Sequence, residues 1–369
     1  MTTIPLAIML TISSLPALST GIGQAAGSPP PLRAGDVAKL EAMAETGDPD
    51  AQLRVATAYA NGEGVARNAA VAAKWYLKAA ERGSAVAQTY LGVAYMTGDG
   101  VERDKTRALI LYRLAARQNY ADAMFNLGTA YYNGDGVNIN DAVAYAWFLL
   151  AKDAGSKNAE DAVRRSETEL KPAVILEGLK EIARIYERGN VLQKNESLSA
   201  HWWQKAAEKG DQDARIVIAD RFLSARGVKE DTVEAKKWCT EAVKASEAEG
   251  IPDHRAYYCL GIVAERESDP KKARDWYEKA SRLRSVQGKK ALARLCAKGE
   301  GGKVDRPQAW ILYLEVTRSH DEAVIPQLKE LKAEMSNKEW NEVKKRLTLM
   351  HIDLEDVTFL LEKKSSPAK

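Results

Sequence analysis

The chain has few of the residues from which metal and catalytic sites are usually built. Its 369 residues include three cysteines and four histidines. No Cys-x-x-Cys or His-x-x-x-His pair occurs in the sequence, and a zinc ion needs several such donors converging on one point. The histidines are scattered along the chain, at His201, His254, His320 and His351. We therefore expect no metal site and no cofactor.

An excess of charge of one sign is also missing. The 54 Lys and Arg residues and the 51 Asp and Glu residues are interleaved and give a net charge of +3. The basic block or stripe that is typical of nucleic-acid-binding proteins is absent from the sequence. Nucleic acid is therefore not an expected partner.

Long hydrophobic runs are missing except near the start of the sequence. Residues 4–18 are apolar with interspersed Ser and Thr, and no charged residue precedes Arg33. Together with the cleavage-like Gly23-Gln24-Ala25, this pattern predicts a signal peptide over residues 1–26, although no Lys or Arg precedes the apolar stretch. A Pro/Gly-rich linker is predicted over residues 27–35. The apolar stretch at residues 4–18 is too short and too interrupted for a stable membrane span.

This leader leads us to expect an exported protein, in the periplasm or outside the cell. The alternative is a cytoplasmic protein whose leader is disordered or touches a membrane.

What the sequence does contain is a repeat of fixed length. Gly62 and Gly64 form a Gly-x-Gly pair, and equivalent pairs follow at intervals of 36 residues. A fixed period of this length is the mark of a solenoid, which stacks one small unit many times. The glycines do not form a phosphate-binding loop, because neither a third glycine after a strand nor Gly-Lys-Ser/Thr accompanies them. The turns also lack the alternating acidic residues of a calcium loop.

Each repeat predicts two helices joined by the glycine turn. A tyrosine lies three residues before the first glycine, at Tyr59, Tyr95 and Tyr131. A second helix follows each turn and carries large residues at 75–76, 111–112 and 147–148, followed by alanines. Asn68, Asp104 and Asn140 lie at its expected start, where such side chains cap free backbone N–H groups. We call the helix before the turn helix A and the one after it helix B.

The same template continues along the chain with losses. The fifth repeat has Ala225 in place of the first glycine, and the sixth has lost the Gly-x-Gly turn. The regular 36-residue spacing is interrupted between the third and fourth repeats. These features divide the chain as follows: N-terminal repeats over 36–155, an inserted helical segment over 156–177, C-terminal repeats over 178–316, capping helices over 317–363 and a disordered tail over 364–369.

The three cysteines fall at core positions of this template. Cys239 occupies the position of Tyr76, Cys296 that of Tyr95, and Cys259 adjoins a Leu-Gly pair. We expect buried thiols that pack as small hydrophobic side chains. A disulfide among them remains an alternative if the protein is exported. No histidine lies within four residues of any of them in the sequence, so a nucleophilic cysteine is not expected.

The repeat resembles a known family. Its consensus is Ala-x-x-x-Leu-Gly-x-x-Tyr-x-x-Gly-x-Gly-Val, followed by Ala-x-x-Trp-Tyr-x-x-Ala-Ala-x-x-Gly. Residues 87–101 and 123–137 match its first half almost fully. This pattern is similar to the Sel-one-like repeat, a branch of the tetratricopeptide superfamily, over roughly residues 36–316. The resemblance implies an all-α fold: a right-handed α-solenoid of about seven helical hairpins, with an inserted helix and C-terminal capping helices. It also implies an adaptor or scaffold role in multiprotein complexes.

If the hairpins stack as tetratricopeptide pairs do, helix A lines a concave groove. Residues two before, two after and five after the core leucine then face this groove. The candidate partner-binding residues are Leu53, Thr89, Val93, Met96, Phe125, Thr129, Tyr132 and Arg184. Aromatic side chains on a rigid face are typical binding anchors. The alternative is that Phe125 and Tyr132 pack internally, against the inserted helix or a neighbouring repeat.

These observations favour a non-catalytic scaffold that binds protein or peptide partners. The sequence indicates neither which partners bind nor the oligomeric state of the protein. Two alternatives remain open. One is a regulatory or hydrolase-associated module with a cryptic small-molecule site, and the other is a structural component of a cell-envelope or polysaccharide-export assembly.

Overall fold

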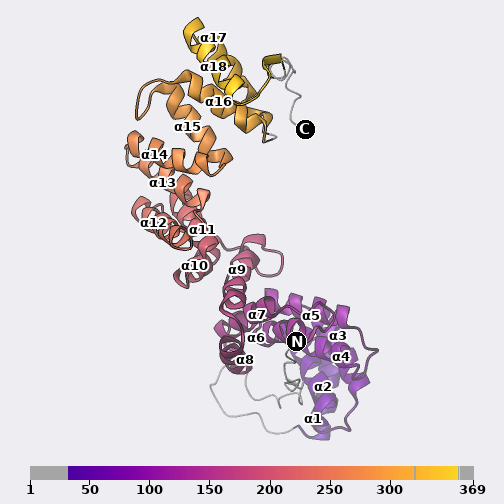
Figure 1. Ribbon diagram of the computed structural model, residues 1–369. Coiled ribbons are helices and arrows are strands. Elements are labelled where there is room, and N and C mark those ends of the chain that lie inside the picture. Colours follow the sequence, from indigo (N-terminus) through magenta and orange to yellow (C-terminus); the bar gives the residue numbers. More distant parts are fainter. Residues whose placement is uncertain (1–31, 320, 356, 358–369) are drawn as a thin grey trace, which may run out of the picture. The chain divides into compact units, whose positions relative to one another are not determined.

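The computed structural model describes residues 32–319, 321–355 and 357 of the chain (Figure 1). Within these residues it contains eighteen α-helices, one 3₁₀ helix and no strand, which confirms the predicted all-α fold. The helices belong to two compact units, Met1–Asn195 and Glu196–Lys369, and each unit is described separately below. The predicted signal peptide and C-terminal tail lie outside the described residues.

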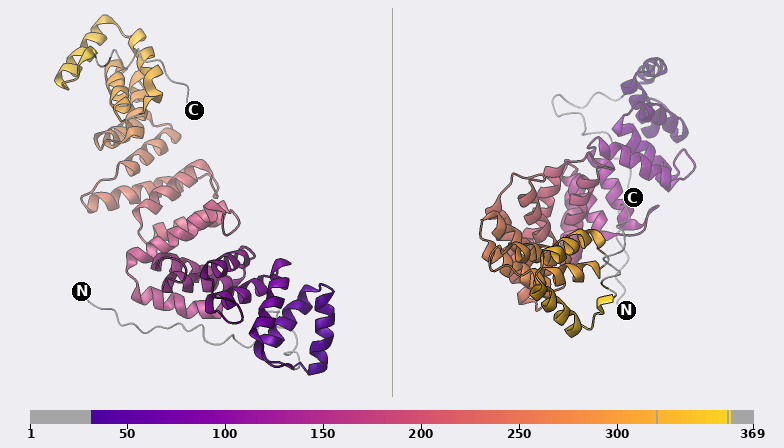
Figure 2. Two further views of the ribbon diagram at one scale, coloured as in Figure 1. Left: turned by 90° about the vertical axis from the view of Figure 1, so that its right-hand side faces the viewer. Right: turned by 90° about the horizontal axis from the view of Figure 1, so that it is seen from above.

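The first unit contains nine helices in its described part. They are α1 (Ala34–Glu45), α2 (Pro49–Asn61), α3 (Ala69–Glu81), α4 (Ala85–Thr97), α5 (Lys105–Arg117), α6 (Ala121–Asn133), α7 (Asp141–Asp153), α8 (Lys157–Glu169) and α9 (Pro172–Arg188). Helix α1 begins two residues before the expected start of the repeats at residue 36. Consecutive helices pack on one another from α1 to α8, so the hairpins stack side by side (Figure 2).

The second unit contains the other nine helices of the described chain. They are α10 (Glu196–Glu208), α11 (Gln212–Ser224), α12 (Thr232–Ala248), α13 (His254–Arg266), α14 (Pro270–Arg282), α15 (Val286–Lys298), α16 (Arg306–Thr317), α17 (Ile325–Glu334) and α18 (Asn337–Leu349). The 3₁₀ helix Glu322–Val324 precedes α17. The segment of capping helices predicted over 317–363 extends beyond the described residues.

The turn chemistry read from the sequence is confirmed in the first three hairpins. Gly62, Gly98 and Gly134 end their helices A with φ angles of 76°, 82° and 77°, a region that glycine enters without steric cost. The side chain of Asn68 accepts a hydrogen bond from the N–H of Val71. Asp104 and Asn140 cap α5 and α7 in the same way. Hairpin formation is thus encoded locally in each of these three repeats.

Small residues let the two helices of a hairpin approach closely. Gly92 lies at the middle of α4 against Tyr112 of α5, and a Cβ atom on Gly92 would lie 2.6 Å from Cε1 of that ring. Gly128 faces Phe148 in the same way in the next hairpin. Interiors packed at this density have no room for an added methyl group unless a neighbour moves. The glycine of the Leu-Gly pair is therefore a packing residue.

The segment between the third and fourth repeats contains α8 and the start of α9. Helix α8 ends at Glu169, and Pro172 lies at the first position of α9, where a missing N–H is harmless. The inserted segment predicted over 156–177 therefore includes the start of α9. Helix α7 packs against α6, α8 and α9, which buries all eight residues from Ala144 to Ala151.

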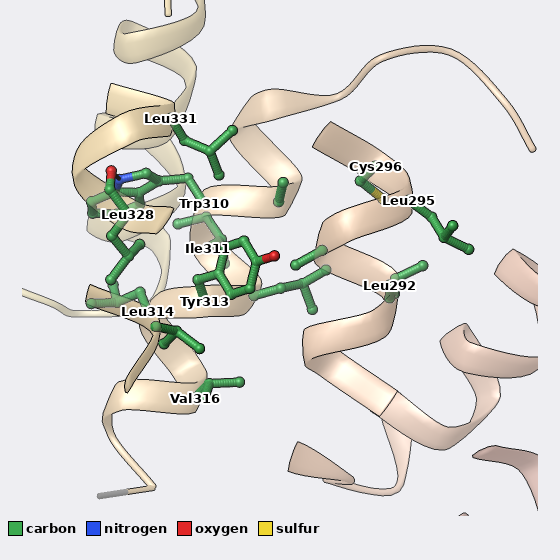
Figure 3. Packing of buried hydrophobic residues seen from close by; sticks show 14 of the residues in the cluster. Leu292, Leu295, Cys296, Trp310, Ile311, Tyr313, Leu314, Val316, Leu328 and Leu331 are labelled. Atoms are coloured by element: carbon green, nitrogen blue, oxygen red, sulfur yellow. Dashed lines mark hydrogen bonds between the residues drawn. The ribbon is translucent and has the colours of Figure 1, made fainter. Parts of the chain in front are cut away.

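The C-terminal helices cover the last hairpin. Trp310 of α16 is fully buried beneath α17 and α18, and its indole N–H donates a hydrogen bond to the carbonyl oxygen of Leu328 (3.0 Å). Its ring meets Trp340 of α18 edge-on. Figure 3 shows Trp310, Leu314 and Leu328 within the same apolar cluster. The hydrophobic face of α16 is thus closed.

Among the described residues, no helix is both long and apolar enough to cross a bilayer.

Candidate functional site

The candidate groove residues differ in exposure. Thr89, Met96 and Thr129 are buried, with exposed fractions of 4%, 4% and 8%. The Thr89 hydroxyl donates to the carbonyl oxygen of Ala85 (2.8 Å), and the Thr129 hydroxyl donates to that of Phe125 (3.1 Å). All three side chains are covered by neighbours on closely packed helices, so they offer a partner little accessible surface.

The remaining apolar candidates are half-buried. They are Leu53 of α2, Val93 of α4, and Phe125 and Tyr132 of α6. The Phe125 ring lies 5.5 Å from that of Phe148 on α7. Phe125 therefore packs within its own hairpin, a contact that neither sequence interpretation includes. Leu53, Val93 and Tyr132 are the candidates left with both an anchored and an accessible part.

Arg184 belongs to an ion-pair network along α9. Its guanidinium lies 2.6 Å from Glu177 and 3.5 Å from Glu181, while Lys180 also contacts Glu177 (3.0 Å) and Arg188 contacts Glu181 (3.1 Å). Burial alone would raise the pKa of Glu177, but hydrogen bonds from Arg184 and Lys180 outweigh it and hold this pKa below its ordinary value. The positive charge of Arg184 is therefore balanced by the carboxylates of Glu177 and Glu181.

A cleft that the sequence analysis missed lies in the second unit. It has a volume of about 350 Å³ and lies between α12, α13 and α14. Its apolar lining comprises Val243, Leu260, Val263, Ala264 and Trp276, and its polar lining comprises Lys236, Thr240, Lys244, Glu267 and Lys272.

The cleft exists because the sixth repeat lacks the usual turn. In five of the other repeats the second turn glycine lies against the start of the preceding helix B: a Cβ on Gly100 would lie 2.3 Å from the carbonyl oxygen of Ala69, the first residue of α3. The same close approach occurs at Gly64, Gly136, Gly227 and Gly301, which meet the starts of α1, α5, α10 and α14. The short turn after α13 brings no such glycine to the start of α12. Val233 there is 76% exposed.

Two further substitutions in the template enlarge the opening. Ala264 stands where the first four repeats have the tyrosine of helix A, and Tyr59 at that position reaches Glu41 of α1 to donate a hydrogen bond (2.7 Å). An alanine leaves that space empty. Lys236 stands at the position of Ala73 and Leu109, which are buried apolar residues. The signal was thus present in the sequence as an alanine and a lysine at two template positions, beside a missing turn.

The charges around the cleft are partly paired. Lys236 contacts the Glu267 carboxylate (2.9 Å), and Lys272 contacts Asp269 (2.7 Å). Within the described residues, no carboxylate lies at ion-pair distance from Lys244. Trp276 stacks on Tyr257 at 5.9 Å, and the ammonium group of Lys279 lies over the Trp276 ring at 4.3 Å. The rim is therefore basic around one aromatic side chain.

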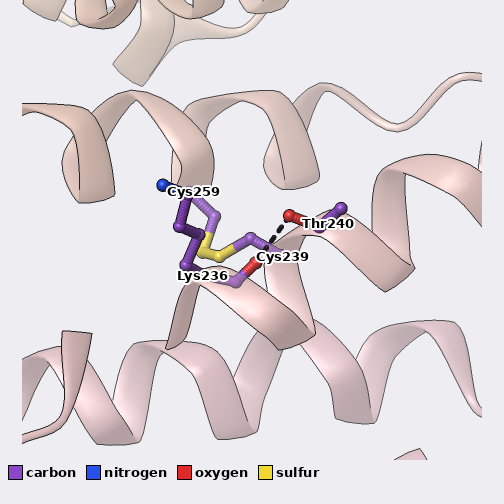
Figure 4. Close-up of a disulfide and its surroundings, with 4 residues drawn as sticks. All are labelled: Lys236, Cys239, Thr240 and Cys259. Atoms are coloured by element: carbon purple, nitrogen blue, oxygen red, sulfur yellow. Dashed lines mark hydrogen bonds between the residues drawn. A yellow bond between two sulfur atoms is a disulfide. The ribbon is translucent and has the colours of Figure 1, made fainter. Parts of the chain in front are cut away.

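A disulfide between Cys239 and Cys259 joins α12 to α13 beside the cleft (Figure 4). Their Cα atoms lie 5.9 Å apart, within the usual range for disulfides. The interpretation of these two residues as free thiols is wrong, although both are buried. The bond occupies the template position at which Tyr76 of α3 and Tyr90 of α4 stack. The pairing depends on the distance between neighbouring hairpins, which sequence spacing alone does not give.

Cys296 is the free thiol of the described chain, and it is buried as expected. Burial raises the pKa of this thiol, which disfavours the reactive thiolate. Among the described residues, no three His, Cys, Asp or Glu side chains gather in a way that could hold a metal ion.

Comparison with known proteins identifies the repeat. The family model of the Sel1 repeat matches seven segments, at residues 49–84, 85–120, 121–156, 177–211, 219–246, 256–285 and 289–315. The chain is similar to the chitin synthase regulator SKT5 of Saccharomyces cerevisiae, with 31% identity over 127 residues. That match covers 32% of this chain and only 17% of the yeast protein.

Two solved structures are also similar. One is a protective antigen of uropathogenic Escherichia coli that displays an SLR fold, with 26% identity and a TM-score of 0.43 over 83% of this chain and 69% of that one. The other is a Sel1 repeat protein from Oxalobacter formigenes, with 30% identity and a TM-score of 0.32 over 68% of this chain and 93% of that one. Because the seven segments of the Sel1 model together cover more than half of the sequence, the chain belongs to the Sel1 repeat family.

Proposed function

We propose that this protein is a non-catalytic scaffold that holds protein or peptide partners on the surface of its repeats. Membership of the Sel1 repeat family implies a role in protein–protein interaction, and this observation carries the proposal. The name of the yeast relative describes a regulator, but the match covers too little of that protein to transfer its partner.

In the first unit we assign partner contact to the helix A side chains that remain accessible. Tyr132 of α6 is half-buried, so its ring is held by the fold while part of it stays exposed. Val93 of α4 and Leu53 of α2 are exposed to a similar degree. Rings that lose little conformational freedom on binding make good anchors. Phe125 is a weaker probe, because its truncation would also remove the contact with Phe148.

The test compares affinity capture from the cells that make the protein, using the full chain and two variants. Tyr132→Ala removes the anchor, and Ile139→Ala shortens an exposed side chain in the turn of the same hairpin. We expect the recovered amount of specific partners, quantified by mass spectrometry, to fall at least fivefold with Tyr132→Ala and to be unchanged with Ile139→Ala. Equal recovery of every partner by all three proteins would contradict the assignment.

An enzyme assay panel on the pure protein tests the non-catalytic part of the proposal. Turnover that a single point substitution abolishes would favour the hydrolase-associated alternative. A partner set made up only of envelope or polysaccharide-export components would favour the structural alternative.

We also propose that the protein is exported. The apolar leader over residues 1–26 supports this, and so does the disulfide between Cys239 and Cys259, because disulfides persist mainly in oxidising compartments. Cell fractionation with sequencing of the mature N-terminus tests it. A cytoplasmic protein that retains Met1 would overturn the proposal.

A further inference from the structure

We propose that the cleft between α12, α13 and α14 binds an acidic peptide segment of a partner protein, with one large apolar side chain inserted between the helices. The inference rests on the proposed scaffold function and adds a second, separate site to it. No part of it depends on the helix A residues of the first unit.

The dimensions of the cleft suit a single side chain. Its volume is about 350 Å³, whereas a cavity of about 150 Å³ is enough to admit benzene. The floor is apolar, formed by Val243, Leu260, Val263 and Ala264, and Trp276 forms part of the wall. A leucine or phenylalanine side chain can therefore be removed from water there, which is the main source of affinity at such anchors.

The charges at the rim select the rest of the ligand. Lys236, Lys244 and Lys272 line the opening, with Glu267 as the one lining carboxylate. Lys236 and Lys272 are each paired with a carboxylate, whereas no described carboxylate pairs with Lys244. Aspartate or glutamate residues flanking the anchor would meet this unpaired ammonium group. A basic segment would be repelled by it.

A shallow depression extends the cleft along α14. Trp276 and Lys272 line both hollows, and Lys279 and Arg282 continue the basic lining of the second one, together with Asp275 and Glu278. Arg282 is paired with Glu278 (2.7 Å), while Lys279 lies over the Trp276 ring. A peptide that follows α14 would therefore meet a second cation, Lys279, which no described carboxylate pairs with, at one turn's distance from Trp276.

The walls of the cleft are fixed in place before a ligand arrives. The Cys239–Cys259 bond joins α12 to α13 next to Thr240 and Leu260, both of which line the cleft. Binding to a site that is already ordered loses less conformational entropy. The missing turn opens the cleft, and the disulfide keeps the two helices together despite the opening.

The experiment uses the full chain and a fluorescein-labelled peptide, Asp-Asp-Leu-Asp-Asp, with blocked ends. Its matched controls are Lys-Lys-Leu-Lys-Lys and Asp-Asp-Ala-Asp-Asp. Fluorescence anisotropy should show binding of the acidic leucine peptide, at least tenfold tighter than that of either control. A single-stranded oligonucleotide of equal negative charge should not compete.

Two variants locate the site. Ala264→Tyr restores the template side chain and fills the cleft, so it should weaken binding of the acidic peptide at least tenfold. Lys244→Glu changes only an exposed charge and should weaken it about three- to tenfold, while Lys338→Glu on α18 should leave it unchanged. Because Lys244→Glu does not touch the core, it keeps the test valid even if Ala264→Tyr folds poorly.

Equal binding of the basic peptide, stronger binding of the oligonucleotide, or full binding by both Ala264→Tyr and Lys244→Glu would overturn the inference. Affinity capture with the unaltered chain and with Tyr132→Ala tests the scaffold function separately. If the unaltered chain captures partners that Tyr132→Ala loses, but the acidic peptide does not bind, the cleft proposal is wrong and the scaffold function stands.

Discussion

Replacing Gly92 by alanine tests whether the centre of helix A is a site of close helix packing. A Cβ atom at this position would lie 2.6 Å from Cε1 and 2.9 Å from Cδ1 of Tyr112, and 3.3 Å from the carbonyl oxygen of Ala108. Tyr112 is 2% exposed, so its ring has little space into which to move. The helices α4 and α5 must therefore separate, or the ring must leave its preferred rotamer.

The magnitude follows from two opposing effects. Alanine favours the helix over glycine by about 0.5–1 kcal/mol, whereas overpacking a close-packed core costs about 1–3 kcal/mol. We expect Gly92→Ala to lower the free energy of unfolding by about 1–2 kcal/mol. Gly35→Ala in α1 is the matched control, because no heavy atom lies within 4 Å of its added Cβ. That control should be neutral or slightly stabilising.

Urea unfolding followed by circular dichroism measures the change, and hydrogen exchange of the α4 and α5 amides localises it. Tyr112→Leu combined with Gly92→Ala should cost less than the sum of the two single changes, because the ring that clashes is then absent. Gly92→Ala as stable as the unaltered chain, with no coupling to position 112, would refute the packing argument.

Three further predictions concern the cysteines and the α9 network. Thiol titration in denaturant should find one reactive thiol without reductant and three after reduction, and three thiols before reduction would contradict the disulfide. The double variant Cys239→Ser, Cys259→Ser should lower the free energy of unfolding by about 3 kcal/mol, as expected for a closed loop of this length. Because burial raises the pKa of Cys296, iodoacetamide at pH 8 should modify that residue only after unfolding, as read by mass spectrometry; rapid labelling of the native protein would count against it. The pKa of Glu177 is lower in the fold than its ordinary value of 4.5, so its contribution to stability is present above that value and is lost as the pH falls through the folded pKa. Hydrogen exchange of α9 amides across this acid range should show the loss, and Glu177→Gln should flatten it; an unchanged pH profile would remove the network as its cause.

The hairpins could be predicted from the sequence because their determinants are local. A glycine at positive φ after Tyr95 and a capping Asp104 act within a few residues of one another, and the period of 36 residues repeats these signals. The local sequence around Pro172 is compatible both with the end of an inserted helix and with the start of a new helix. The packing of α9 on α7 decides between them.

Side-chain exposure and the cleft could not be predicted in the same way. Thr89 and Val93 share one helix and differ in burial, because exposure depends on how closely the neighbouring hairpins stack. The cleft results from the turn that the sixth repeat lacks and from the small side chain at Ala264. Predicting the disulfide requires the distance between helices of neighbouring hairpins, which the sequence does not give. In the structure Cys239 and Cys259 lie at the template positions where Tyr76 and Tyr90 stack.

Repeat proteins usually gain or lose whole units without much harm, since each unit touches only the next. Helix α7 breaks that modularity, because three helices enclose it and eight consecutive residues, Ala144–Ala151, are shielded from water. Deleting the hairpin of α2 and α3 would shorten the array, whereas deleting that of α6 and α7 would strip α8 and α9 of their shared support. Length variation among related chains should therefore concentrate before α6, and circular permutants opened near α7 should be the least tolerated.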